Sequence, residues 1–361
     1  MSGKVLRGPG RRNKNHKGVN LALQGGGAHG AFTWGVLDKL FEDDRIWVEA
    51  MSGTSAGAMN AVVAAQGMFE GGAEGARVAL RDFWKAVAKA GTASPFRRSA
   101  VSKMTGDWSL NNSPSFIWFD LLARMASPYQ LNPFDINPLR DLVEEQIDFK
   151  KVRGCGDMQV YLAATNVETG RLRVFGADEI DIDVAMASAC LPTMYQTVEV
   201  DGAPYWDGGF MGNPPLSPFL DNSPSNDILI VQINPVFRPG SPRTAPDIQN
   251  RLNEITFNSS LLHELRLIEI INKLIDEGKL DRSEFKRMRI HVLADLQRMP
   301  ELDASSKLNA EWPFLEHLFG IGRDTAAAWL DAHFDDLGER SSVDVAALTD
   351  IAVRKYNQAT A

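Results

Sequence analysis

The sequence predicts an α/β protein with three layers, in which helices cover both faces of a mostly parallel central sheet and helical additions follow toward the carboxyl end. Two strand-like runs, residues 19–24 and 46–52, each end in a glycine-rich turn that leads into a helical pattern. A third apolar run, residues 228–233, is typical of a strand buried on both faces. Apolar residues make up 44% of the 361 residues and charged residues 23%, which is the composition of a globular protein with a sizeable core.

The first part of the predicted domain alternates strands and helices. The strand 19–24 is followed by an amphipathic helix over residues 32–41, and the strand 46–52 by a helix of small residues over 58–65. Apolar residues at helical spacing predict a further helix over 80–87. This order of elements favours a parallel sheet.

Residues 91–138 interrupt the regular pattern and are predicted to form an insertion over the sheet. The segment contains five prolines and the apolar run 116–122. That run has two interpretations. It is either a helix buried in the core, or a lid that lines a pocket for an apolar ligand or rests on an apolar surface.

Regular elements return after residue 138. A helix is predicted around 139–147, a strand over 158–166 that pairs with 171–175, and a short helix over 183–189. An Asp-Gly turn between residues 197–200 and 203–206 indicates a β-hairpin. Beyond the strand 228–233, the sequence predicts a long helix, a strand and two separate helices, over residues 248–275, 289–293, 315–319 and 326–330.

These elements suggest three parts: a basic, disordered tail over residues 1–17, a main domain over 18–235 and a mostly helical extension over 236–361 that packs on the same domain. The tail carries six lysines and arginines and no acidic residue, whereas the whole chain has a net charge of −8. The acidic body argues against nucleic acid as a partner. The tail lacks the apolar core of a signal peptide, and it is either a solvated start or a contact for anionic lipid.

The two cysteines, Cys155 and Cys190, are too few for a disulfide framework or a CxxC metal site. We therefore expect no metal or organic cofactor. The sequence has no apolar run of about 18 residues, the length of a membrane-spanning helix. These features favour a cytoplasmic protein whose contact with membranes, if it has one, is peripheral.

Gly53-Thr54-Ser55-Ala56-Gly57 has the GxSxG spacing of a nucleophile elbow, between a predicted strand and a predicted helix. A serine on such a turn needs small neighbours, and the start of the following helix favours negative charge nearby. The alternative is a tight strand–helix junction with an incidental serine.

Gly25-Gly26-Gly27-Ala28-His29-Gly30 follows the first strand. Consecutive glycines leave backbone N–H groups unshielded, so the loop suits an oxyanion or a phosphate. The spacing also satisfies the GxGxxG pattern of dinucleotide-binding folds, for which Asp43 or Asp44 is the available acidic partner. An oxyanion hole explains the glycines and Ser55 together, whereas a nucleotide loop leaves Ser55 without a role.

A nucleophilic serine needs a base. Of the six histidines, only His29 is near the predicted site in sequence. The alternative base is Asp207, at the end of the predicted hairpin, where Gly208 and Gly209 allow close approach of the backbone. Taken alone, Asp-Gly-Gly is more typical of an ordinary turn than of a catalytic site.

Together, the glycine loop, the Ser55 motif and Asp207-Gly208-Gly209 resemble the three motifs of the patatin-like phospholipase family. The resemblance runs from about residue 18 to 215 and includes connecting segments at 164–170, 187–192 and 213–215. It implies a patatin-like three-layer fold and a Ser–Asp dyad without histidine, with Ser55 as nucleophile and Asp207 as base. It also implies an oxyanion hole formed by residues of the glycine loop, namely Gly25, Gly26, Gly27 and Ala28. Small motif positions support this arrangement, namely Gly30, Gly53, Gly57, Gly208 and Gly209.

The function implied by the resemblance is hydrolysis of fatty acyl esters through an acyl-serine intermediate, as in a phospholipase A or lysophospholipase. Three alternatives stay open at this point. The first is an esterase or depolymerase that acts on another hydrophobic ester. The second is an acyltransferase, and the third is a non-catalytic protein that binds lipid or nucleotide.

Overall fold

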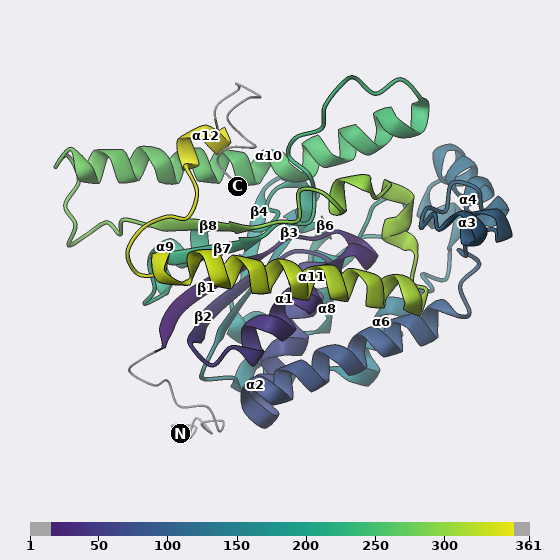
Figure 1. Cartoon of the computed structure of the whole chain (residues 1–361). Helices are drawn as coiled ribbons and strands as arrows, with labels where there is room; N and C mark the ends of the chain where they lie inside the picture. Colours follow the sequence, from purple (N-terminus) through teal and green to yellow (C-terminus); the bar gives the residue numbers. More distant parts are fainter. Residues whose placement is uncertain (1–15, 350–361) are drawn as a thin grey trace.

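The computed structural model describes residues 16–349 and shows one central sheet with helices on both faces (Figure 1). Its strands are β1 Lys17–Leu23, β2 Ile46–Gly53, β3 Gln159–Asn166, β4 Leu172–Phe175, β5 Val198–Val200, β6 Ala203–Asp207, β7 Asp227–Val231 and β8 Arg289–Leu293. They are ordered β5-β6-β3-β2-β1-β7-β8, and β4 also pairs with β3. The pairs β1–β2, β1–β7, β2–β3 and β7–β8 are parallel, whereas β4 and the β5–β6 hairpin are antiparallel. The predicted mostly parallel sheet is confirmed.

Twelve α-helices lie in the described residues: α1 Gly30–Glu42, α2 Ala56–Gly91, α3 Ala100–Thr105, α4 Pro114–Met125, α5 Pro128–Leu131, α6 Pro138–Gln146, α7 Phe149–Gly154, α8 Ile182–Ser188, α9 Ser217–Asn222, α10 Ala245–Asp276, α11 Trp312–His333 and α12 Val345–Thr349. Short 3₁₀ helices include η1 Gly27–His29, η3 Gly208–Phe210, η5 Ala304–Leu308 and η6 Phe334–Asp336.

Two hydrophobic cores, one on each face of the sheet, make the three layers. Alternate residues of β1 point to opposite faces, so Leu21 packs into the core that includes α1, α2 and α11, and Ala22 packs into the core that includes α9, α10 and α12. Figure 1 shows α10 along one face of the sheet and α1, α2 and α11 along the other. The predicted three-layer α/β/α fold is therefore confirmed.

The helices predicted over 58–65 and 80–87 lie in the two halves of the single helix α2. The helix breaks at Gly71 and Gly72, and Gly72 has φ 64° and ψ −151°. After the break the second half turns back on the first, so that a Cβ at Gly67 would lie 2.5 Å from the carbonyl oxygen of Gly75.

The prediction of two separate helices near the carboxyl end is wrong, because residues 312–333 form the single helix α11. Glycines in its middle suggest a break, but they mark a close crossing with α1. A Cβ at Gly322 would overlap the carbonyl oxygen of Phe32, and a Cβ at Gly35 would overlap that of Phe319. Packing on α1 therefore keeps α11 continuous across its glycines.

The region beyond residue 235 is an integral part of the fold. It adds β8 to the sheet edge and supplies helices to both layers, α10 to one and α11 to the other. It also reaches the amino end of the sheet, where the Lys17 ammonium donates to the carbonyl oxygens of Phe334 and Asp335 at 3.0 and 3.2 Å. Lys17 thus belongs to β1 rather than to the predicted tail, and residues 1–15 lie outside the described residues.

The predicted insertion contains α3, α4 and α5, and α3 and α4 lie at one edge of Figure 1, away from the sheet. The interpretation of its apolar run as a buried core helix is wrong, because Trp118 is 64% exposed and Ile117 is 53% exposed. We call residues 101–136 the apolar segment. Its exposed apolar side chains are Val101, Met104, Ile117, Trp118, Leu121, Leu122, Met125, Tyr129, Leu131, Phe134 and Ile136.

Candidate active site

Ser55 occupies the sharp turn between β2 and α2. Its backbone has φ 55° and ψ −121°, a conformation that costs a residue other than glycine about 1–3 kcal/mol. Two hydrogen bonds hold the turn: the Ser55 N–H donates to the Ser188 hydroxyl at 3.1 Å, and its carbonyl accepts from the Met59 N–H at 3.0 Å. The surrounding structure thus fixes the side chain in a strained position at the start of a helix, as the GxSxG spacing predicts.

The glycines around Ser55 are required by close backbone approach. A Cβ at Gly57 would overlap the Leu23 carbonyl oxygen at the end of β1, and a Cβ at Gly53 would lie 2.5 Å from the Gly57 carbonyl oxygen. A Cβ at Gly25 would lie 2.8 Å from the Ser55 Cβ, so the glycine loop is packed directly against the serine. A Cβ at Gly30 would lie 2.7 Å from the Cβ of Ala56.

The glycine loop has fewer free N–H groups than the sequence suggests. The Gly25 N–H donates to the Asn213 side-chain oxygen at 2.6 Å, so Gly25 is not available as an oxyanion donor. The N–H groups of Gly26, Gly27 and Ala28 have no recorded acceptor within residues 16–349. They are the remaining candidate donors, and Gly27 has φ 58°, which favours glycine.

Two buried amide side chains hold this loop in place. The Gln24 side-chain oxygen accepts from the N–H groups of Ile233 and Asn234, both at 2.9 Å. The Asn234 side chain in turn donates to the Gly25 carbonyl oxygen at 2.8 Å. The loop is therefore fixed to the end of β7 before any ligand binds.

Asp207 ends β6 and is completely buried. Its backbone N–H donates to the Cys190 carbonyl at 2.8 Å, and its own carbonyl accepts from the Thr165 hydroxyl at 2.9 Å. One carboxylate oxygen, Oδ1, accepts from the Gly209 N–H at 2.7 Å. The other, Oδ2, has no hydrogen-bond partner among the described residues.

The environment of Asp207 changes its basicity. Burial raises the pKa of Asp207 to about 6, while the Gly209 N–H, the Ser55 hydroxyl and the charge of Lys307 oppose this shift. The Ser55 hydroxyl thus lies next to the carboxylate, although no hydrogen bond of regular geometry joins it to Oδ2. A carboxylate with a pKa near 6 is a better general base at neutral pH than an ordinary aspartate.

Gly208 and Gly209 allow the backbone to turn sharply after Asp207. A Cβ at Gly208 would overlap the Ala163 carbonyl oxygen of β3, and a Cβ at Gly209 would overlap the ring of Phe257 on α10. The Asp-Gly-Gly sequence is therefore more than an ordinary turn, because both glycines are needed to seat the carboxylate between β3 and α10.

The histidines have other partners. His29 Nε2 lies 2.7 Å from the Ser306 hydroxyl, and burial, together with the charge of Lys307, lowers its pKa well below the ordinary value. His291 Nε2 lies 3.0 Å from Asp227 Oδ1, at the beginning of β7. Neither contact involves Ser55 or Asp207, so the geometry favours Asp207 as the base.

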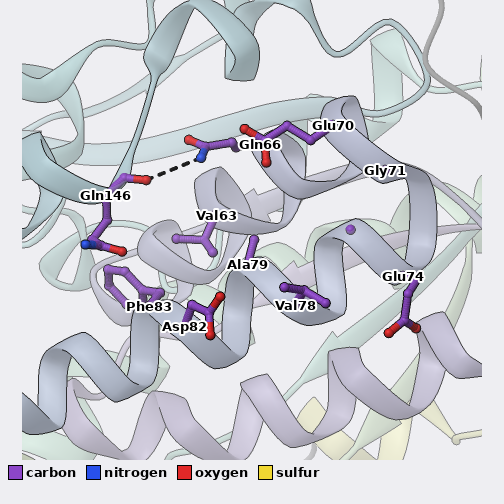
Figure 2. Close-up of a pocket in the computed structure, with 11 residues that line it drawn as sticks. Val63, Gln66, Glu70, Gly71, Glu74, Val78, Ala79, Asp82, Phe83 and Gln146 are labelled. Carbon is purple, nitrogen blue, oxygen red and sulfur yellow. Dashed lines mark hydrogen bonds between the residues drawn. The ribbon is translucent and has the colours of Figure 1, made fainter.

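A separate pocket of about 480 Å³ lies between the two halves of α2 (Figure 2). In Figure 2 the Gln66 side chain donates to the Gln146 carbonyl at one end of this pocket, at 3.3 Å. Its carboxylates Glu70 and Glu74 are paired with Lys151 and Arg77. None of the predicted site residues lines this pocket.

Several residues that shape the site carry little signal in the sequence. Asn213 and Ser188 lie in the connecting segments that resemble the family, but their hydrogen bonds to Gly25 and Ser55 join parts of the chain more than 130 residues apart. Asn234 and Lys307 lie beyond those segments, and no pattern in the sequence places them near Ser55.

Comparisons with known proteins identify the family of the chain. Residues 21–220 match the family model of the patatin-like phospholipases. No curated protein matches the chain at a significant level. Similar solved structures include VipD from Legionella pneumophila, with 16% identity, a TM-score of 0.40 and coverage of 89% of this chain and 67% of that chain.

The type III effector ExoU shares 15% identity with a TM-score of 0.36, and the match covers 88% of this chain and 53% of that chain. The chain thus spans about half the length of ExoU. The family match covers more than half of the 361 residues and includes Ser55 and Asp207. The chain belongs to the patatin-like phospholipase family.

Proposed function

We propose that this protein is a serine lipid acyl hydrolase of the phospholipase A or lysophospholipase type. Ser55 is the nucleophile and Asp207 is the base. The observation that carries the proposal is a strained serine at the start of α2, next to a buried carboxylate whose Oδ2 has no hydrogen-bond partner among the described residues. Membership in a family of phospholipases supports the choice of substrate.

In the first half of the reaction, Ser55 Oγ attacks the ester carbonyl carbon and its proton passes to Asp207 Oδ2. The negative charge that forms on the carbonyl oxygen is stabilised by the N–H groups of Gly26, Gly27 and Ala28, each donor being worth about 3 kcal/mol in a well-formed oxyanion hole. The tetrahedral intermediate collapses, and the leaving alcohol takes the proton from Asp207. An acyl-serine remains.

The second half repeats these steps with water. Asp207 accepts a proton from a water molecule, which attacks the acyl carbonyl carbon, and the oxyanion forms in the same place. Collapse of this intermediate breaks the bond to Ser55 Oγ, and the proton on Asp207 returns to the serine. The fatty acid leaves, and the site is restored.

The apolar segment is proposed to meet the lipid surface. It is tied to the rest of the fold at two points: the Leu110 N–H donates to the Ser305 hydroxyl at 2.9 Å, and the Tyr129 hydroxyl lies 3.0 Å from that of Thr197. Burying its exposed side chains in lipid gains about 25 cal/mol for each Å² of apolar area. No helix within residues 16–349 has both the length and the apolar character needed to cross a membrane. Peripheral contact by this segment would bring an acyl ester to the site.

Product analysis tests the proposal. Wild type and Ser55→Ala are incubated with a panel of diacyl phospholipids, lysophospholipids and neutral fatty esters, and the products are identified by mass spectrometry. We expect free fatty acid and the matching lyso-lipid or alcohol from wild type only. Fatty acid release by a folded Ser55→Ala protein would contradict the proposal, and acyl transfer to an added alcohol without free fatty acid would indicate an acyltransferase.

A further inference from the structure

Lys307 lies directly on the glycine loop, although it is 280 residues away in sequence. A Cβ at Gly27 would lie 2.5 Å from the Lys307 carbonyl oxygen and 3.3 Å from the Lys307 Cβ. Lys307 belongs to η5, outside residues 21–220 that match the family. The carboxyl-terminal region therefore packs directly against the glycine loop.

The Lys307 ammonium is held beside the site by one hydrogen bond, to the Asn234 side-chain oxygen at 2.8 Å. It lies 5.8 Å from the ring centroid of Phe257, which packs against Gly209. An ammonium group has three N–H donors. Within residues 16–349 no carboxylate lies within ion-pair distance of this ammonium group, so two donors are left for a ligand or water.

Charged and titratable groups from several neighbouring elements face Lys307. They are Glu254 of α10, Arg238, Asp207, Asp303 and His29. Glu254 is paired with Arg238 at 2.7 Å and with Arg251 at 3.1 Å, so its charge is already compensated. Asp207 has no ion-pair partner among the described residues, and the charge of Lys307 lowers its pKa against the effect of burial.

We propose that Lys307 is an electrostatic positioning residue of this active site, whose ammonium group favours negative charge first on Asp207 and then on the oxyanion beside the glycine loop. The inference rests on the proposed function. During the reaction a negative charge leaves Asp207 when it accepts the serine proton, and a negative charge forms near Gly27. The Asn234 side chain accepts from the Lys307 ammonium group and donates to the Gly25 carbonyl oxygen, so the positive charge is held next to the loop where the new charge forms.

The ionisation of Lys307 limits this role at high pH. Burial lowers the pKa of Lys307 to about 8, so the group is mostly charged at pH 7 and neutral above pH 9. The pKa of Asp207, about 6, sets the acidic side. We therefore expect a bell-shaped pH profile of kcat/KM whose alkaline limb belongs to Lys307.

The test compares Lys307→Gln, which keeps a donor for Asn234 but removes the charge, with Lys307→Arg, which keeps the charge. Lys273→Gln, on an exposed part of α10, is the matched control. The pH profile of kcat/KM is measured with a soluble short-chain ester, together with the melting temperature of each protein. A soluble substrate removes any contribution from lipid binding.

We expect Lys307→Gln to lower kcat at pH 7 at least tenfold with little change in KM. Its acidic limb should move to higher pH, because loss of the positive charge raises the pKa of Asp207, and its alkaline limb should disappear. Lys307→Arg should recover part of the activity and move the alkaline limb beyond pH 9, while Lys273→Gln should match wild type.

A Lys307→Gln profile with both limbs of wild type would overturn the inference and leave the proposed function intact. So would equal losses in the Gln and Arg variants, accompanied by lower melting temperatures, because this pattern indicates a purely structural role. If wild type hydrolyses none of the esters, the proposed function fails and this inference fails with it.

Discussion

The candidate catalytic centre, formed by Ser55 and Asp207, and the apolar segment of this protein differ most in their exposure. Asp207 has no exposed surface and Ser55 is 9% exposed, whereas Phe134 is 86% exposed and Met104 is 89% exposed. The buried centre fixes charged and strained groups in place, while the apolar segment presents apolar side chains to solvent. This difference suggests a division of labour, in which bond cleavage depends on the first region and contact with aggregated lipid on the second.

The largest effect should come from the base. Asp207→Asn removes the proton acceptor, so kcat/KM should fall about 10²–10⁴-fold on soluble and aggregated esters alike. Equal losses on both kinds of substrate would place Asp207 in the chemical step. Activity within a few fold of wild type would mean that another group is the base.

The same substitution should stabilise the fold. Because burial raises the pKa of Asp207 from 3.8 to about 6, the folded state favours the protonated form, and stability is lost as pH rises through about 6. At pH 7.5 an uncharged Asn should add on the order of 2–3 kcal/mol to the free energy of unfolding. Urea unfolding of both proteins at pH 7.5 and pH 4 measures this, and the gain should shrink at pH 4.

Two leucine substitutions test how much a buried helix and the apolar segment each contribute to the free energy of unfolding. Leu37 on α1 is completely buried, whereas Leu121 on α4 is 48% exposed. We expect Leu37→Ala to lower the free energy of unfolding by about 2–5 kcal/mol and Leu121→Ala by about 0.5 kcal/mol or less. A large loss from Leu121→Ala in urea unfolding would show that α4 is packed in solution.

The acidic side of the pH profile should follow Asp207. The base must be ionised, so kcat/KM on a soluble ester should fall about tenfold for each pH unit below about 6. An ordinary aspartate would place this limb near pH 4. A limb near pH 4 would show that Asp207 is more hydrated than its buried position implies.

The smallest predicted effect concerns the apolar segment. Replacing Trp118 and Leu122 with Ser should reduce the rate on long-chain phospholipid vesicles several-fold and leave the rate on a soluble ester unchanged, because only the lipid contact is weakened. Val78→Ser, at another exposed apolar position on α2, is the control and should change neither rate. Equal losses of rate on both substrates would show instead that the segment supports the folded structure rather than lipid contact.

The sequence predicts the layers and most elements because these depend on local patterns. The alternation of strand and helix and the turn signals at Gly25, Ser55 and Asp207 all lie within short windows. The continuity of α11 is not visible in this way, since Gly322 looks like a break until α1 is placed against it. The exposure of α4 is likewise hidden, because an apolar run has the same composition whether it is buried or open.

In the candidate site, too, local sequence patterns reveal some residues and tertiary packing determines others. Motifs identify Ser55 and Asp207 but do not show that the Gly25 N–H is taken by Asn213, because that bond joins residues 188 positions apart. Lys307 reaches the glycine loop through tertiary packing of η5, and nothing near it in sequence marks that place. Sequence patterns therefore locate the turns that carry Ser55 and Asp207, but they do not reveal partners that arrive from distant elements.

The most direct test of the central claim is covalent labelling with a fluorophosphonate, followed by peptide mapping with mass spectrometry. The proposed dyad predicts a single adduct on the peptide that contains Ser55, slow labelling in Asp207→Asn and no labelling in Ser55→Ala. An adduct on another residue, or undiminished labelling of a folded Ser55→Ala protein, would contradict the assignment of Ser55 as the nucleophile.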